Sequence, residues 1–291
     1  MAEVERNLTI GAAHGYNLIG NPFTQNIKLT DVEKGSADFA DGFYVLSNQN
    51  TWGARLTGNE IKPMQGFLVQ ATTAGDVTIG KPSSGSKGER SNEQVTNIEA
   101  TVSNSSYSDN AFAMLGEGNG LNKVNHRNAE APMLYIPQDG EDFAIAFMNE
   151  ETRVFPLNFK AMTTGNYTIN LKPTDNVNYL ILIDNMTGEE TNMLLEDCYP
   201  FVGSPADYEN RFTVKLGISN GNDDDEQFVY QYGNELIING EGMLQMFDVL
   251  GRVVISEEVH GQRVNIGGLT TGAYIVRMTG NEVKTQKIIV R

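Results

Sequence analysis

The stretch Gly272-Ala-Tyr-Ile-Val-Arg-Met278 alternates apolar and polar side chains near the end of a 291-residue chain. Successive side chains of a strand point to opposite faces of a sheet, so Tyr274, Val276 and Met278 are expected to point into one core. Similar short runs surround this stretch and are cut by Gly and Asn. They predict seven strands, near 228–232, 235–239, 242–248, 252–258, 262–266, 273–279 and 283–290. Strands this short and this closely spaced predict an immunoglobulin-like sandwich over 227–291.

The upstream chain shows the same pattern of short apolar runs separated by the turn-forming residues Gly, Asn, Asp or Pro. One helical signal, Thr30-Asp-Val-Glu-Lys34, predicts one or two turns. The Gly/Ser-rich stretch 81–88 and the acidic loop that ends at Glu226 interrupt the pattern. We therefore predict an all-β chain of tandem sandwich-like units that ends in a seven-stranded immunoglobulin-like sandwich. The predicted parts are a β-rich unit at 1–93, a β-sandwich unit at 94–219, an acidic linker at 220–226 and the terminal sandwich at 227–291. The first two could equally form one composite sandwich.

Charge and composition exclude several classes of protein. The formal net charge is −16, and the tail from Gln227 onward carries as many basic as acidic residues. The whole net negative charge therefore lies upstream of Gln227. Such a surface repels phosphates, and we predict no nucleic-acid binding. The single cysteine, Cys198, cannot form an intrachain disulfide. The apolar run Leu180–Ile183 is far too short to span a membrane.

Three stretches of the tail together resemble the C-terminal sorting domain of type IX (Por) secretion substrates in Bacteroidetes. They are Met246-Phe-Asp-Val-Leu-Gly-Arg-Val-Val254, Gly272-Ala-Tyr-Ile-Val-Arg277 and Lys287-Ile-Ile-Val-Arg291. The resemblance implies that the outer-membrane secretion and processing machinery recognises and removes the folded tail. It also implies joining of the mature protein to surface lipopolysaccharide, and a location outside the cell or on its surface.

The positions that match the signatures define the predicted sorting-signal motif. They are Asp248, Gly251, Arg252, Gly272, Tyr274, Val276 and Lys287. Gly251 lies at an expected hairpin tip, where a positive φ is often needed. The start of the chain, Met1–Arg6, has no basic region followed by an apolar stretch. We therefore expect the signal peptide to be absent from this sequence, which would be the C-terminal fragment of a longer exported protein.

A second, looser resemblance covers much of the upstream chain. Tyr16–Phe23 with Pro63–Val69, and Tyr179–Gly188 with Asn210–Val214, are similar to the β-rich region common just before such tails. The resemblance implies a recurrent β-rich region that precedes the tail, and it implies no catalytic activity. The dipeptide Asn21-Pro22 also has a local explanation, because it is ordinary turn chemistry.

No catalytic constellation is predicted, so we expect no enzyme activity and no cofactor. Gly217-Ile-Ser-Asn-Gly221 matches a nucleophile-elbow pattern, but the acidic residues after it are a poor start for the required helix. The histidines have no triad or zinc spacing; they are His14, His126 and His260. We predict no metal site. Weak binding of extracellular calcium at an acidic loop such as Asp223–Glu226 is left open.

Trp52, the only tryptophan, lies in Asn48-Gln-Asn-Thr-Trp-Gly53, which we interpret as a loop. A loop tryptophan flanked by amides is a possible glycan-binding residue, but the favoured reading is that it plugs the core. We predict an adhesive or structural cell-surface protein. The alternative is a carbohydrate-binding accessory region of a secreted glycan-degrading enzyme, with host or environmental glycans as partners.

Overall fold

The computed structural model describes residues 3–11, 14–80, 96–174, 177–218, 228–232, 234–238, 240–260, 263–280 and 283–290. Strands make up most of these residues and no α-helix is among them, so the predicted all-β fold is confirmed. The helix predicted at Thr30–Lys34 is only partly right. A single 3-10 turn, η1, spans Leu29–Asp31, and the chain then enters β4 at Val32–Lys34.

The chain divides into two compact units. Unit 1 comprises Met1–Thr174 and Ile181–Lys215, and unit 2 comprises Asp175–Leu180 and Leu216–Arg291. The predicted linker at 220–226 and the Gly/Ser-rich stretch at 81–88 lie outside the described residues. The boundary between 1–93 and 94–219 stays a prediction.

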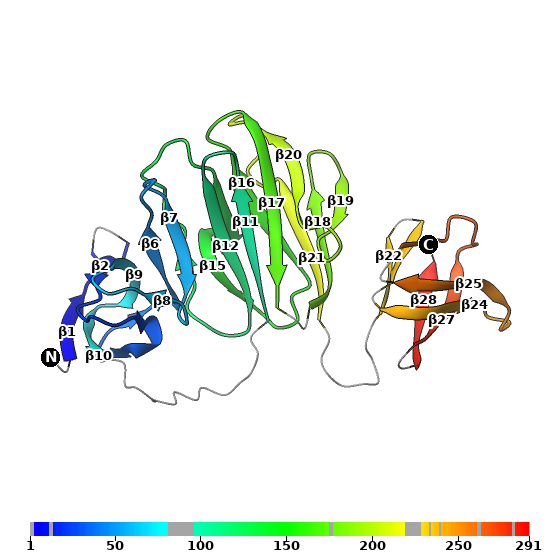
Figure 1. Cartoon of the computed structure of the whole chain (residues 1–291), viewed down its shortest axis with the longest axis horizontal. Coiled ribbons are helices and arrows are strands. Elements are labelled where there is room, and N and C mark those ends of the chain that lie inside the picture. The colour runs from blue at the N-terminus through cyan, green and yellow to red at the C-terminus, as the bar shows by residue number, and fades with distance from the viewer. Residues whose placement is uncertain are drawn as a thin grey trace. The chain divides into compact units, whose positions relative to one another are not determined.

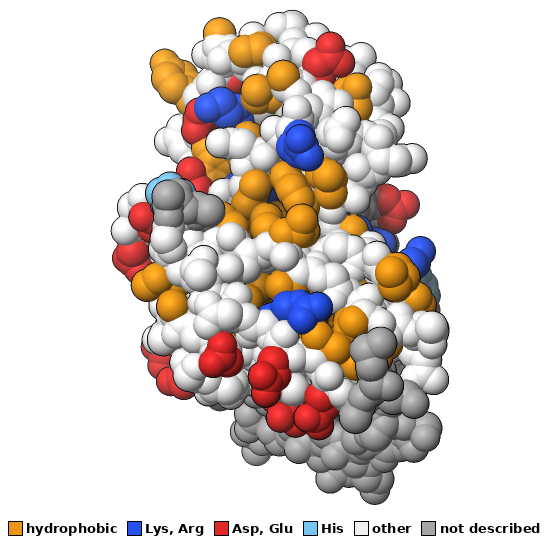
Figure 2. All heavy atoms as spheres, turned by 90° about the vertical axis from the view of Figure 1, so that its left-hand side faces the viewer, with side chains coloured by type: hydrophobic (Ala, Val, Ile, Leu, Met, Phe, Trp, Pro, Cys, Tyr) orange, Lys and Arg blue, Asp and Glu red, His pale blue; other side chains and the backbone are white. Residues whose placement is uncertain are grey.

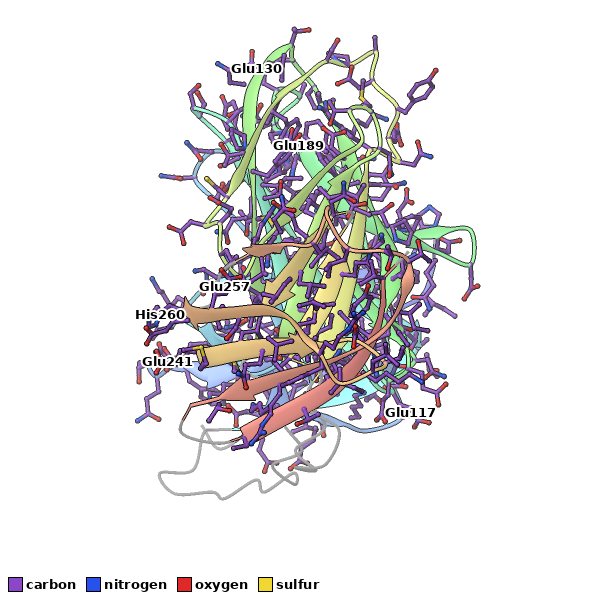
Figure 3. The ribbon with its side chains drawn as sticks, turned by 90° about the vertical axis from the view of Figure 1, so that its right-hand side faces the viewer. Glu117, Glu130, Glu189, Glu241, Glu257 and His260 are labelled. Carbon is purple, nitrogen blue, oxygen red and sulfur yellow. The ribbon has the colours of Figure 1, made fainter. Side chains whose placement is uncertain are left out.

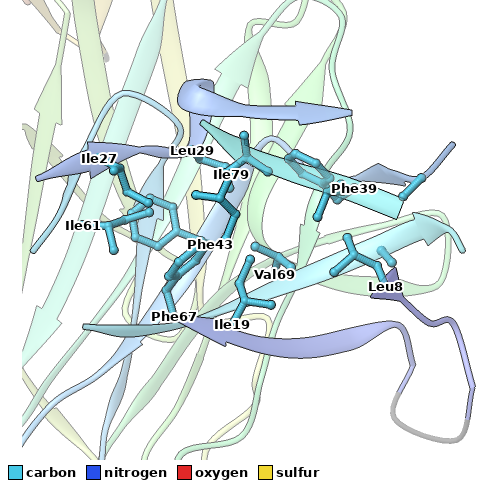
Figure 4. Close-up of a cluster of buried hydrophobic side chains, with 14 of the residues drawn as sticks. Leu8, Ile19, Ile27, Leu29, Phe39, Phe43, Ile61, Phe67, Val69 and Ile79 are labelled. Atoms are coloured by element: carbon cyan, nitrogen blue, oxygen red, sulfur yellow. The ribbon is translucent and has the colours of Figure 1, made fainter. Parts of the chain in front are cut away.

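The first strands of unit 1 form small antiparallel sheets (Figure 1). One has the order β1-β10-β4, another has the order β2-β9-β6-β7 with β5 beside β9, and β3 pairs with β8. Their bounds are β1 Glu3–Leu8, β2 Tyr16–Gly20, β3 Ile27–Lys28, β5 Asp38–Phe39, β6 Gly42–Leu46, β7 Trp52–Leu56, β8 Glu60–Ile61, β9 Gly66–Thr73 and β10 Gly75–Gly80. Figure 4 shows their shared core, in which Phe43 and Phe67 meet edge to face at 5.8 Å between ring centroids.

The strands between residues 97 and 218 form one long sheet. Its order is β19-β18-β21-β16-β14-β15-β12-β11-β17-β20, with β13 against β15. The pair β12–β15 is parallel and the other described pairs are antiparallel. The bounds are β11 Asn97–Ser103, β12 Ser108–Leu115, β13 Leu121–Asn122, β14 Met133–Gln138, β15 Glu141–Met148, β16 Val154–Lys160, β17 Gly165–Pro173, β18 Val177–Asp184, β19 Glu189–Asn192, β20 Tyr199–Gly203 and β21 Phe212–Ile218.

A hydrophobic cluster joins the two strand systems of unit 1. Tyr44 and Ala54, from β6 and β7, pack in one cluster with Phe112 and Ile145, from β12 and β15. The main-chain oxygen of Asn122 accepts hydrogen bonds from the hydroxyls of Tyr16 (2.9 Å) and Tyr44 (2.6 Å). Residues on either side of the 81–95 segment therefore share a core.

The described part of the tail contains the seven predicted strands. They are β22 Val229–Tyr232, β23 Glu235–Ile238, β24 Glu241–Phe247, β25 Val253–His260, β26 Arg263–Asn265, β27 Gly272–Thr279 and β28 Val283–Val290. The two sheets have the orders β22-β23-β26 and β25-β24-β27-β28. Both contribute to a single core, which contains Tyr274, Val276 and Met278 as predicted. The tail is therefore a sandwich.

Asn21, in the first half of the first upstream motif, is buried, and its N–H donates to the main-chain oxygen of Gln65 in the second half at 3.0 Å. Its Nδ2 donates to the main-chain oxygens of Gln25 (2.8 Å), Ile61 (3.0 Å) and Lys62 (3.1 Å). Its Oδ1 accepts from the N–H of Phe23 at 2.9 Å. Asn21 thus does more than initiate a turn, because one side chain satisfies backbone groups of two loops.

We expect Asn21→Ala to lower the free energy of unfolding of unit 1 by about 2–4 kcal/mol, because it leaves several buried backbone groups unpaired. Urea denaturation followed by the fluorescence of Trp52 measures this, since the only tryptophan lies in unit 1. Asn26→Ala is the control: its amide bonds only to the exposed Glu60 at 2.7 Å, and its loss should cost less than about 0.5 kcal/mol. Equal effects from the two variants would contradict the prediction.

One face of unit 1 carries exposed apolar side chains. Figure 2 shows hydrophobic side chains gathered near the middle of the face it presents. Leu18 and Met64 are among the most exposed apolar residues of the described chain, at 70% and 82%. No helix in the described ranges is long and apolar enough to cross a membrane.

Candidate functional site

The hairpin between β24 and β25 carries the first sorting signature. Asp248 Oδ1 accepts from the N–H groups of Leu250 (2.9 Å) and Arg252 (3.0 Å), and its Oδ2 accepts from Arg252 Nε at 2.7 Å. The backbone and side-chain hydrogen bonds from Arg252 hold the pKa of the Asp248 carboxyl below its ordinary value. Gly251 has φ +76°, as expected at this tip. The three signature residues thus build one turn.

We expect Gly251→Ala to destabilise the tail by about 1–2 kcal/mol, because residues with a Cβ are strained at this positive φ. A Cβ at Gly251 would meet no atom within 4 Å, so backbone strain alone is tested. Gly268→Ala is matched: its Cβ also meets nothing within 4 Å, and its φ lies outside the left-handed range. Hydrogen exchange of the β24 and β25 amides measures the effect. Similar exchange rates in both variants would contradict the prediction.

The second signature forms the start and the buried face of β27. Gly272 begins the strand opposite Val290. The Tyr274 hydroxyl donates to the main-chain oxygen of Thr270 at 2.7 Å, which ties the strand to the loop before it. Val276 is fully buried in the core. These residues position the sheet rather than form an exposed surface.

The same arrangement occurs in unit 1, which the sequence analysis missed. Thr163-Thr-Gly-Asn-Tyr167 repeats the spacing of Thr270-Thr-Gly-Ala-Tyr274. The Tyr167 hydroxyl donates to the main-chain oxygen of Thr163 at 2.6 Å, and Tyr167 and Ile169 are buried like Tyr274 and Val276. The repeated five-residue pattern could have revealed it.

Lys287 and an apolar row occupy the outer face of the four-stranded sheet. Lys287 pairs with Ile275, which pairs with Phe247, which pairs with Val253. Lys287 is exposed, and the exposed fractions of Val253 and Ile275 are 50% and 40%. At the adjacent hairpin tip, Val249 and Leu250 are 79% and 75% exposed. The sorting signature therefore borders a partly apolar surface, the kind of surface on which proteins associate.

The histidines are not brought together. His260 ends β25 beside Glu241 on β24, with 3.8 Å between Nδ1 and Oε2, and both side chains are exposed (Figure 3). His126 is buried, and its Nδ1 accepts from the N–H of Trp52 at 3.0 Å. No group of three or more candidate ligands able to hold a metal ion occurs in the described part of the chain. The acidic loop Asp223–Glu226, at which weak calcium binding stays open, lies outside it.

Trp52 lies in a strand, so its prediction as a loop residue is wrong. It begins β7 and pairs with Leu46 of β6, because the turn is completed one residue earlier, at Thr51. Its partly buried ring packs edge to face on Tyr44 at 6.4 Å, against the cluster that joins the strand systems of unit 1. This packing agrees with the interpretation that the Trp52 side chain fills part of the core. Glycan binding by Trp52 stays a prediction.

The tail thus defines a class: a terminal β-sandwich module that follows a larger β unit. Residues 229–291 match the family of secretion system C-terminal sorting domains. The match supports a type IX secretion substrate, and it implies export to the cell surface or the medium. No curated protein and no solved structure matches the chain.

Proposed function

We propose that the tail directs type IX secretion through a folded, immunoglobulin-like sandwich, and that the upstream unit has an adhesive or structural role at the cell surface. The observation that carries the proposal is the sorting-domain match over 229–291. The tail geometry supports it, since the first signature forms an ordered hairpin tip beside the exposed apolar row.

The immunoglobulin-like assignment is supported by the sixth strand of the sandwich, β27. A tyrosine near the start of that strand, bonded to the backbone a few residues upstream, is a hallmark of this fold. Tyr274 meets this description. The strand order differs at one place from that of constant-type immunoglobulin domains, in which the fourth strand lies in the sheet of the first, second and fifth strands. Here the fourth strand, β25, pairs with β24 and not with the sheet of β22, β23 and β26.

An adhesive or structural role for unit 1 is supported by the use of its charged groups. Asp184 and Arg211 are buried and bonded to each other at 2.8 Å, and Asp109 and Lys123 are buried together at 2.5 Å. These charged groups bond to each other inside the unit and are not exposed on its surface. We further propose surface lipopolysaccharide as the attachment partner of the processed protein.

The export proposal is tested by expressing the full chain behind a signal peptide in a Bacteroidetes host with type IX secretion. We expect the protein in the surface or medium fraction, and in the periplasm when residues 229–291 are deleted or when the host lacks the secretion pore. Surface delivery without the tail would overturn the proposal. Mass spectrometry of the mature C-terminus reports whether the tail is removed.

The carbohydrate-binding alternative has its own test, because unit 1 contains the only tryptophan. Saturable heat changes on calorimetric titration with bacterial or host glycans, lost in Trp52→Ala, would favour the alternative. We expect no such change.

A further inference from the structure

Three ionisable side chains are buried together in unit 1. The distance from Lys123 Nζ to Asp109 Oδ2 is 2.5 Å, and the distance from His126 Nε2 to Asp109 Oδ1 is 3.3 Å. The exposed fractions of the side chains are 2% for Lys123, 0% for Asp109 and 1% for His126. Neither the sorting function nor the sequence motifs account for this cluster.

The surrounding backbone contacts each group, and Lys123 Nζ donates to the main-chain oxygen of Asn110 at 3.2 Å. The N–H of Leu134 donates to Asp109 Oδ2 at 2.7 Å. The N–H of Trp52 donates to His126 Nδ1, so neutral His126 carries its hydrogen on Nε2, the nitrogen nearest Asp109 Oδ1. Neither of these two atoms has a well-formed hydrogen bond, although they lie 3.3 Å apart. A donor therefore lies beside one carboxyl oxygen while the amine lies beside the other.

The apolar environment brings the amine closer to its reactive, neutral form. Leu121, two residues before Lys123, and Val124, directly after it, belong to the cluster that joins the strand systems of unit 1. Burial lowers the pKa of Lys123 against the opposing effect of Asp109. Burial raises the pKa of Asp109, but Lys123 and His126 outweigh it and hold that pKa below its ordinary value. The resting cluster is thus an ion pair, and the neutral amine and acid form its minor state.

We propose that Lys123 and Asp109 become joined by an intramolecular amide bond between Nζ and Cγ, formed once by the folded chain with loss of one water. A proton passes from the ammonium to the carboxylate, giving the neutral acid with its hydrogen on Oδ1, and the free amine attacks Cγ. The Leu134 N–H stabilises the charge that develops on Oδ2, as donors do in an oxyanion hole. A second proton moves from nitrogen to the Oδ1 hydroxyl, which leaves as water while the His126 Nε2–H donates to it. The C–N bond replaces one C–O bond, and no oxidant is needed.

Such a bond would tie β12 to the segment after β13 covalently. The chain has one cysteine and so cannot close a loop by an intrachain disulfide. An amide cross-link restricts the unfolded chain in the same way as a disulfide does, but it resists reduction.

The intact mass of the folded full chain tests the proposal directly. We expect a mass lower by one water, and a tryptic digest that contains one branched product joining the Asp109 and Lys123 peptides. Lys123→Met and Asp109→Ala should each have the full mass of their own sequence. His126→Gln should slow bond formation about a hundredfold, because one donor to the reacting oxygen is lost. The control pair Lys160–Glu209, at 2.9 Å but about half exposed, should stay unlinked.

Two results would overturn the proposal, and both come from the unaltered chain. The first is a folded protein that keeps its full sequence mass, which would make the cluster an ion pair only. The second is a loss of water that fragment ions place elsewhere, for example in a succinimide at Asp41-Gly42 or Asp139-Gly140. Neither result bears on export, which the tail alone tests.

Discussion

Replacing Asp184 by alanine will lower the free energy of unfolding of unit 1 by about 3–5 kcal/mol, because it leaves the buried Arg211 guanidinium without its main partner. Arg211 Nη2 lies 2.8 Å from Asp184 Oδ2, and its Nε lies 3.1 Å from the same oxygen. The exposed fractions of the two residues are 1% and 4%. Bulk water therefore does not reach this pair in the folded chain.

Further bonds hold Arg211 in place once Asp184 is gone. Nη1 donates to the main-chain oxygen of Val202 (2.8 Å) and to Asp207 (3.0 Å), and the guanidinium lies 4.5 Å from the centre of the Phe201 ring. The cation thus stays in the core at a cost. Replacing both partners by apolar residues, Asp184→Leu with Arg211→Met, should recover much of the loss, as it does for other buried pairs.

Urea denaturation followed by Trp52 fluorescence measures these differences. Lys215→Ala on β21 is the control: its 3.8 Å pair with Glu190 is partly exposed and should be worth less than about 1 kcal/mol. A loss for Asp184→Ala no larger than that of the control would contradict the prediction.

The contrast between these pairs shows what the sequence can predict. Alternation within one strand is a local pattern, so the seven tail strands and the inward face of Tyr274, Val276 and Met278 could be predicted. Turn chemistry is also local, so Gly251 could be placed at a hairpin tip.

Contacts between distant segments could not be predicted in that way. Asp184 and Arg211 lie in the two halves of the second upstream motif, Tyr179–Gly188 and Asn210–Val214. The sequence does not show that they meet; the sheet order, with β18 beside β21, brings them together. The cluster of Asp109, Lys123 and His126 has no motif spacing, because its members come from β12 and the segment after β13. The error at Trp52 is one of boundary: four polar residues before it predict a loop, and the strand begins where they end.

Replacing Val276 by aspartate will unfold the tail and abolish surface delivery, while unit 1 stays folded. Val276 is 0% exposed, and the core around it includes Leu244, Met246 and Ile288. An unpaired carboxylate there costs several kcal/mol, which is about the whole stability of a sandwich of this size. If the machinery recognises the folded tail, an unfolded one leaves the protein in the periplasm.

The neighbouring change Arg277→Asp is the matched control, because it introduces the same side chain on the outer, exposed face of β27. We expect Arg277→Asp to keep the tail folded, with protected β27 amides in hydrogen exchange and normal delivery to the surface. The Trp52 unfolding curve should be the same in both variants, since the tail contains no tryptophan. Normal surface delivery of Val276→Asp, with its β27 amides unprotected, would show that the sorting signal is read as a linear sequence rather than as a folded sandwich.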